Sequence, residues 1–272
     1  MRSVLREPEE PRRPLNLIHS WGIQFLAFLR EAGVATLILL GGLVAVRFLV
    51  QPRARRELVR QLYLAGVKSL PVVTVVGMFT GMILSLQTGL ALRRFGQEVN
   101  IGTAVMVSML REMGPFMTGL ILAASVGSSM AAQLGTMTIS EEIAALEIMS
   151  IAPIRFLVMP RLWALAVMGP LLSFYASMMG VVGGGVVGLT QLGVPWSAYW
   201  DNATLFADNK DLWVGMLKAL CFGLIIATIA CHQGFSARKG ALGVGEATRQ
   251  TVILSFLLIL MTGYFLTRLF YV

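Results

Sequence analysis

The chain has 272 residues, of which 56% are hydrophobic and 13% charged, with a mean hydropathy of +0.76 and a formal net charge of +8. An ordinary soluble domain is about a quarter charged, so this composition excludes one and predicts an all-α polytopic membrane protein. The basic residues cluster at the ends of apolar runs, which indicates membrane topology rather than nucleic-acid binding.

The N-terminal part differs from the rest of the chain. Residues 1–14 mix arginine, glutamate and proline and lack the compact apolar region of a signal peptide, so we expect a cytoplasmic tail. An apolar run at 33–50 follows, but arginines lie on both sides of it, and a crossing would place one basic cluster outside. We therefore predict that residues 15–60 form an interfacial or re-entrant helical element, with Trp21 among its anchors at the headgroup level.

Residues 61–272 are predicted to form one membrane domain with five transmembrane helices, because each further apolar run reaches the ~20 residues that a crossing needs. The runs are 69–92, 102–136, 161–190, 212–232 and 250–270. Positive loops then face the cytoplasm, and the C-terminus faces outward. The 191–211 loop, with Asp201, Asp208 and Asp211, faces outward, and Trp196, Tyr199, Trp200 and Trp213 form an interfacial aromatic belt.

The 102–136 run would be about 50 Å long as one helix, beyond the ~30 Å apolar core, so we expect it to tilt, break at Gly114-Pro115 or extend into the cytoplasm. Arg111 and Glu112 lie inside this run. Charges within a span are costly and mark functional sites. Two interpretations stay open, a polar element at a substrate path or a mutually compensated pair, and the second is slightly favoured.

A short charged helix is predicted at about 138–150, between two apolar runs. Thr138 and Glu141 have capping-box spacing, and Pro153 stops the helix. One face is apolar and the other acidic: Ile139, Ile143, Leu146 and Met149 against Glu141, Glu142 and Glu147. Such a helix suits docking to a soluble partner, and a position on the lipid surface is the alternative.

Other motifs carry weaker signals. Gly77-x-x-x-Gly81 and Gly180-x-x-x-Gly184 fit close helix packing. The glycine-rich stretch 240–248 lacks the Lys-Ser/Thr of a phosphate-binding loop, and no strand precedes it. We expect no cofactor, no metal site and no catalytic residues, so the chain is not expected to be an enzyme on its own.

Several stretches together resemble the MlaE/YrbE permease family, the membrane subunits of MCE-associated ABC transporters, over about residues 58–270. They are Leu110-Arg111-Glu112-Met113-Gly114-Pro115, Gly135-Thr136-Met137, Glu142-x-x-Ala145-Leu146-x-x-Met149, Pro160-Arg161 and Gly240-Ala241-x-Gly243-Val244-Gly245-x-Ala247-Thr248. The resemblance implies a permease that moves phospholipid between the inner and outer membranes of Gram-negative bacteria, and thereby a role in outer-membrane lipid asymmetry.

The resemblance also implies partners and sites. It implies a homodimer in the bacterial inner membrane, a separate cytoplasmic ABC ATPase with a small accessory subunit, and a periplasmic MCE-domain protein. The coupling helix would contact the ATPase through Glu141, Glu142, Ala145, Leu146, Glu147 and Met149. A lipid cavity between the subunits would be lined by the first full span, with Leu84, Ala91 and Leu92 as candidates.

The chain also departs from the family pattern. Relatives often carry Arg and Glu where this chain has Ser125 and Gln133, and Arg where it has Thr138. If the first two pair in relatives, the loss of both avoids leaving one buried charge alone. A permease of another ABC export system and a non-transporting membrane scaffold remain the alternative functions.

Overall fold

The computed structural model describes residues 17–45, 52–205, 207–238 and 240–272, and its elements in this part of the chain are all helical. The predicted tail at 1–14 lies outside the described residues, as does the side chain of Trp21. The helices are α1 (Leu17–Val44), α2 (Pro52–Ala65), η2 (Val67–Ser69), α3 (Leu70–Arg93), η3 (Glu98–Asn100), α4 (Ile101–Ser108), η4 (Met109–Met113), α5 (Gly114–Leu122), η5 (Ala123–Gly127), α6 (Ser128–Ile139), α7 (Glu142–Ile148), η6 (Ile154–Val158), α8 (Met159–Gln191), α9 (Trp196–Leu205), α10 (Asn209–Phe235) and α11 (Ala241–Tyr271).

The predicted fold class is confirmed, because the described chain contains five helical stretches long and apolar enough to cross a membrane. They are Ala54–Arg93, Glu98–Ile139, Ile154–Gln191, Asn209–Phe235 and Ala241–Tyr271. Helices suit this environment because every backbone polar group away from their ends is satisfied within the segment. The protein is therefore a multi-pass α-helical membrane protein.

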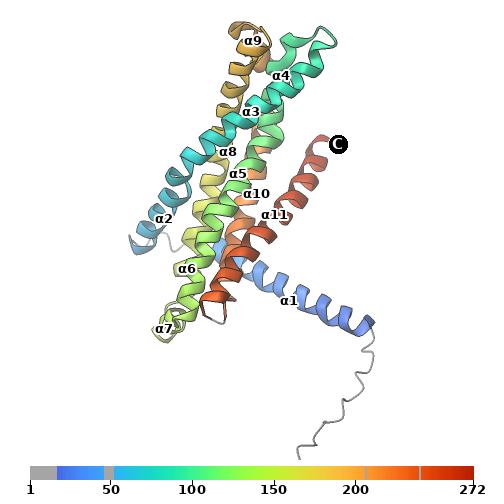
Figure 1. Cartoon of the computed structure of the whole chain (residues 1–272). Helices are drawn as coiled ribbons and strands as arrows, with labels where there is room; N and C mark the ends of the chain where they lie inside the picture. The colour runs from blue at the N-terminus through green and yellow to red at the C-terminus, as the bar shows by residue number, and fades with distance from the viewer. Residues whose placement is uncertain (1–16, 46–51, 206, 239) are drawn as a thin grey trace, which may run out of the picture.

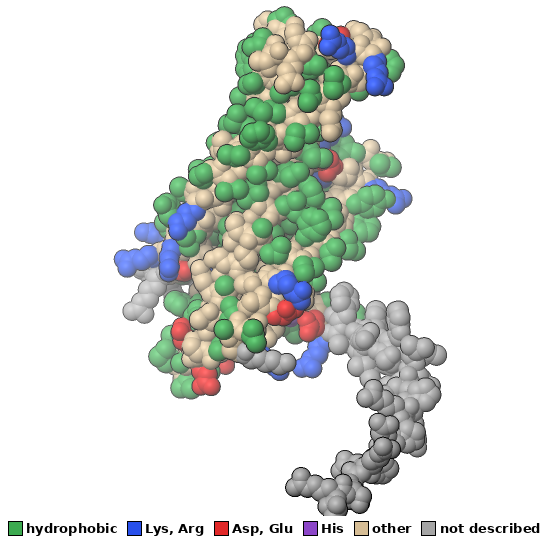
Figure 2. Space-filling view, viewed as in Figure 1, with side chains coloured by type: hydrophobic (Ala, Val, Ile, Leu, Met, Phe, Trp, Pro, Cys, Tyr) green, Lys and Arg blue, Asp and Glu red, His purple; other side chains and the backbone are tan. Residues whose placement is uncertain are grey.

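The spans form one elongated bundle with two distinct ends (Figure 1). The short helix α7 lies at one end and α9 at the other, and we call these the α7 end and the α9 end. Hydrophobic side chains cover the middle of the visible face, while acidic side chains gather at the α7 end (Figure 2). This distribution matches a molecule whose waist lies in lipid and whose ends reach water.

Helix α1 crosses the bundle direction instead of joining it, and it projects sideways near the α7 end (Figure 1). Its C-terminal part is anchored: Ile38 is buried against Leu157 and Val158. At Gly42 an added Cβ would lie 3.1 Å from the Leu162 side chain, so α1 packs closely there. The sideways course is compatible with the predicted interfacial element, which stays a prediction.

Close packing of α3 against α8 depends on glycine. A Cβ at Gly77 would lie 2.9 Å from the carbonyl oxygen of Ala176, and one at Gly81 would overlap that of Gly180. The predicted role of both small-residue motifs in close helix contact is confirmed here. Without side chains between them, the two backbones gain van der Waals contact, which matters in lipid because the hydrophobic effect does not drive helices together there.

The second span is helical from Glu98 to Ile139, so no break interrupts it at Gly114-Pro115. Instead it contains two π-helical turns, η4 and η5. In η4 the amide of Gly114 donates to the carbonyl of Met109, and Pro115, which has no amide to offer, follows directly. The wider turn therefore accommodates the proline within a continuous helical segment, and π turns of this kind often occur at functional sites.

The expected outward loop at 191–211 contains helix α9, and two of its predicted features are wrong. Tyr199 is fully buried and donates to the carbonyl of Val181 at 2.9 Å, whereas the neighbouring Trp196 and Trp200 remain 43% and 38% exposed. Burial also raises the pKa of Tyr199. Asp211 is not a loop residue but lies in the first turn of α10, buried.

Candidate functional site

Two neighbouring side chains of the π turn η4 reach across to α10, and each meets a partner of opposite charge there. Arg111 donates to both carboxylate oxygens of Asp211, from Nε at 2.6 Å and from Nη2 at 3.0 Å. Tyr271, at the end of α11, donates its hydroxyl to the same carboxylate at 2.8 Å. A bidentate guanidinium–carboxylate pair is strong and geometrically specific, so it fixes η4 against the start of α10.

The second pair lies two helical turns further along α10. The Nζ of Lys218 donates to Glu112 at 2.5 Å, to the carbonyl of Arg111 at 2.8 Å and to the hydroxyl of Thr267 at 2.8 Å. Thr267, on α11, also donates to Glu112 at 2.7 Å. The ammonium thus has three acceptors for its three protons, and the pair joins η4, α10 and α11.

The four charges differ in burial, which shows how the network is oriented. The side chains of Asp211 and Lys218 are 1% exposed, whereas those of Arg111 and Glu112 are 38% and 41% exposed. The inner charges therefore depend on the outer ones for compensation, while the outer ones retain an open side. A network of this kind in a span stabilises one arrangement of three helices. It also exposes one positive and one negative side chain at the surface of the bundle.

The structure corrects the preferred interpretation of Arg111 and Glu112, because they do not compensate each other. Each pairs with a residue about one hundred positions away, and the sequence reasoning missed four members of the network: Asp211, Lys218, Thr267 and Tyr271. A signal existed. Asp211 and Lys218 are seven residues apart, two turns along one helix, so they share a face of an otherwise apolar span.

The lipid-cavity candidates lie on α3 but differ in exposure. Leu84 and Leu92 pack against a buried cluster that includes Ile101 and Tyr199, whereas Ala91 is exposed. The opposite side of α3 carries a continuous exposed apolar row at helical spacing: Val72, Val75, Phe79, Ile83, Leu86 and Leu90. This row offers the larger apolar surface, and the assignment of a cavity to α3 stays a prediction.

The charged helix is shorter than predicted, and its expected cap is wrong. Helix α6 continues to Ile139, and α7 covers only Glu142–Ile148. Thr138 is inside α6 and donates to the carbonyls of Leu134 at 2.8 Å and Gly234 at 3.1 Å, so it connects α6 to α10 instead of capping α7. The tertiary contact with Gly234 therefore takes the place of the predicted cap at Thr138.

The predicted coupling residues of α7 lie together at the α7 end. Ile143 and Leu146 are partly buried against a cluster that includes Leu134 and Cys231, and they hold the helix on the bundle. The remaining side chains are exposed, acidic and apolar together: Glu141, Glu142, Ala144, Ala145, Glu147, Ile148 and Met149. Ile148 and Met149 are 84% and 61% exposed, an arrangement typical of a surface that binds another protein.

Left-handed backbone conformations at both ends set the direction of α7. Glu141 has φ of 58° and Ser150 has φ of 60°. At Ser150 the chain closes the helix with backbone hydrogen bonds: the amide of Ser150 donates to the carbonyl of Glu147, and that of Ile151 donates to the carbonyl of Leu146. This motif usually carries glycine at the position of Ser150. These two residues define how the chain enters and leaves α7.

We expect Ser150→Gly to stabilise the protein by about 1 kcal/mol, because glycine removes the cost of a side chain at positive φ. The melting temperature of the purified chain should rise by about 2–4 °C. Ser140→Gly is the matched control, since Ser140 has φ of −81° and gains nothing from glycine. An equal response of the two variants would contradict this account of the α7 exit.

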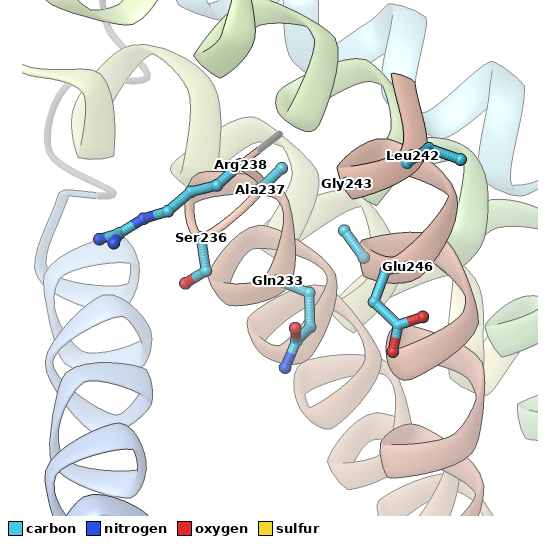
Figure 3. Close-up of a pocket in the computed structure, with 8 residues that line it drawn as sticks. Gln233, Ser236, Ala237, Arg238, Leu242, Gly243 and Glu246 are labelled. Atoms are coloured by element: carbon cyan, nitrogen blue, oxygen red, sulfur yellow. The ribbon is translucent and has the colours of Figure 1, made fainter. Parts of the chain in front are cut away.

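A small pocket of about 250 Å³ lies at the α7 end, at the turn between α10 and α11. Gln233 of α10 and Glu246 of α11 extend in the same direction from the facing helices, and Arg238 extends away from them (Figure 3). Glu246 is paired with Arg249 at 2.8 Å. Leu242 is 85% exposed here, which adds an apolar side chain to the surface at this end.

The departures at Ser125 and Gln133 are not neighbours in space. Ser125 donates to the carbonyl of Ile121, whereas Gln133 contacts Ser129 and accepts from Arg161 at 3.4 Å. Gln133 therefore faces a buried arginine of α8 rather than residue 125. The structure gives no contact that would join the two positions.

Comparison with known proteins gives a consistent result. The family model for the permease MlaE matches residues 58–269. A probable ABC transporter permease protein of Rickettsia prowazekii is 37% identical over 258 residues, 94% of this chain and 98% of the relative. The intermembrane phospholipid transport system permease protein MlaE of Haemophilus influenzae is 32% identical over 261 residues, with the same coverage. A probable ABC transporter permease protein of Synechocystis is 32% identical over 217 residues, 80% of this chain and 82% of the relative.

Proposed function

The chain belongs to the MlaE permease family, and on that premise we propose that it is the membrane subunit of an ABC transporter that moves phospholipid between the inner and outer membranes. A separate cytoplasmic ATPase would power it, and a periplasmic MCE-domain protein would exchange the lipid. The observation that carries the proposal is α7, a helix that packs on the bundle through Ile143 and Leu146 and exposes acids beside Ile148 and Met149. A partner that hydrolyses ATP needs such a fixed contact to transmit its movement.

The proposed orientation follows from α7. If the ATPase binds α7, the α7 end faces the cytoplasm, and the α9 end, with its half-exposed tryptophans, faces the periplasm. The N-terminus is then cytoplasmic and the C-terminus periplasmic, in the inner membrane. The exposed apolar row of α3 runs toward the α9 end and would contact lipid tails, which require apolar walls rather than catalytic groups.

We further propose that two copies form the transporter. The burial of the spans supports this, because 61% of the most apolar window of α10 is buried within one chain but only 11% of that of α11. One chain thus leaves most residues of the apolar windows of α11 and α3 at least partly exposed to lipid or to a second copy. A cavity between two copies would be lined by such surfaces.

Charge reversal on α7 tests the coupling role. We expect Glu141→Lys, Glu142→Lys and Glu147→Lys together to reduce recovery of the ATPase at least about tenfold, since several charge-complementary contacts of about 0.5 kcal/mol or more become repulsive. The measurement is quantitative co-purification from the native membrane. Asp201→Lys, an exposed acid near the α9 end, is the control and should not change recovery. Normal ATPase recovery with the triple variant would contradict the docking role of α7.

The same purification separates the alternatives. Recovery of an ATPase disfavours a non-transporting scaffold, and bound phospholipid disfavours a permease for another class of substrate. Mass measurement of the purified complex gives the number of copies. A chain that purifies alone, without ATPase or lipid, would contradict the proposal.

A further inference from the structure

A second and larger pocket, of about 700 Å³, lies near the α7 end between α2, α6 and the beginning of α8. Its lining is mixed. Arg60, Glu57, Gln133 and Arg161 contribute polar atoms, and Phe156 and Met137 contribute apolar surface. Phe156 is 40% exposed, so the pocket opens beside a side chain that faces outward from the bundle.

Arg161, at the base of this pocket, is a buried cation with weak compensation. The residue is 5% exposed. Its Nη1 donates to the carbonyl of Leu157 at 2.7 Å, its Nη2 reaches Gln133 only at 3.4 Å, and its Nε has no partner. Arginine stays protonated in proteins and carries five N–H donors, so this side chain holds a full positive charge with unused donors.

No carboxylate of the described chain forms an ion pair with Arg161. Glu57, the acid in the same pocket, pairs with Arg60 at 3.6 Å and accepts from Gln61 at 2.8 Å. The contrast with the charge network is clear, because Asp211 and Lys218 are equally buried but each has a charged partner. A buried arginine left with neutral acceptors is costly, and an anion that enters the pocket would remove that cost.

Two features of the pocket favour a phosphate that carries hydrocarbon over other anions: its two arginines and its apolar side. Both Arg60, whose side chain is 70% exposed, and the buried Arg161 line the pocket, so two arginines border one space. Guanidinium forks match the oxygens of a phosphate bidentately. The apolar side of the pocket at Phe156 and Met137 fits a phosphate that carries hydrocarbon.

We propose that this pocket binds the phosphate of a phospholipid headgroup from the leaflet at the α7 end, with Arg161 as its inner contact and Arg60 as its outer one. Inorganic phosphate has the same chemistry and is the competing source. The site is distinct from the network around Arg111 and from α7. It does not depend on the proposed transport function, since a permease for any substrate could hold a lipid there.

The sharpest variant is Gln133→Glu, which places a carboxylate of the same size beside Arg161. The internal acid should pair with the guanidinium and compete with the lipid phosphate. We expect this variant to be at least as stable as the natural chain without lipid, and to bind lipid at this site about tenfold more weakly, the effect of losing one charge-assisted contact. Gln97→Glu is the matched control, because Gln97 is exposed on the segment between α3 and α4.

The measurement uses the purified full chain in non-ionic detergent and native mass spectrometry or thermal shift. The probes are dihexanoylphosphatidylethanolamine, dihexanoylglycerol, which lacks the phosphate, and sodium phosphate. The proposal expects a component of phospholipid binding that Gln133→Glu removes, that Gln97→Glu retains and that dihexanoylglycerol does not reproduce.

Each of the other outcomes contradicts one part of the proposed phosphate site. Equal phospholipid binding by the two variants, or equal binding of dihexanoylglycerol, excludes a phosphate contact at Arg161. Binding of sodium phosphate that is sensitive to Gln133→Glu, without such binding of the phospholipid, assigns the pocket to free phosphate and overturns the lipid. A melting temperature of Gln133→Glu below that of the natural chain contradicts the described state of Arg161.

Discussion

Glu112→Ala should destabilise the protein by about 3 kcal/mol, because it leaves the buried ammonium of Lys218 without its counter-charge. Lys218 is 1% exposed and would keep only the carbonyl of Arg111 and the hydroxyl of Thr267 as acceptors. Thr267 also loses an acceptor, so α11 loses part of its attachment to η4. The measurement is the melting temperature in detergent together with the yield of folded protein.

The double variant Glu112→Ala/Lys218→Met separates a lost charge pair from a general loss of packing. Removal of both partners should restore most of the stability, since buried ion pairs can often be replaced by apolar residues of similar size. Glu246→Gln is the matched control, an acid in an exposed ion pair with Arg249, for which little change in stability is expected because solvent screens the pair. If Glu112→Ala and Glu246→Gln behave alike, the network does not hold the three helices.

Gly81→Ala should disrupt the contact between α3 and α8. The added methyl group would overlap the carbonyl oxygen of Gly180, which is backbone and cannot rotate away as a side chain could. The two helices would have to separate, which costs about 3 kcal/mol or more because overpacking is added to lost van der Waals contact. Folded yield and melting temperature are the readouts.

Gly245→Ala is the control for glycine replacement in a span. It also lies within a long helix, α11, but an added Cβ there meets nothing within 4 Å. Alanine is the better helix former, so this variant should be unchanged or stabilised by up to about 1 kcal/mol. A melting temperature of Gly81→Ala equal to that of Gly245→Ala would refute the close approach of α3 and α8.

The fold was largely predictable from the sequence because its signals are long and local. Apolar runs of membrane length and the placement of arginines gave five spans, and the glycine motifs gave the close contact at Gly81 and Gly180. The short acidic segment was also recognised, since apolar and acidic positions alternate at helical spacing. These patterns each lie within one segment and need no knowledge of its neighbours.

The candidate site was less predictable because its contacts are tertiary. Arg111 and Asp211 are 100 residues apart, and no local pattern says that η4 faces the start of α10. The capping pattern at Thr138 was misleading for the same reason, because a carbonyl of α10 competes for its hydroxyl. The sequence predicted Tyr199 as an interfacial aromatic residue, but its side chain packs against the glycines of α8.

The two π turns also determine the rotational phase of the second span. Each carries about one residue more than an α-helical turn, and one residue corresponds to about 100° of rotation and 1.5 Å of rise. Arg111 in η4 and Thr138 on α6 both contact α10, and the residues between them include the end of η4 and all of η5. The number of residues in this span therefore relates the orientation of α7 to that of the charge network.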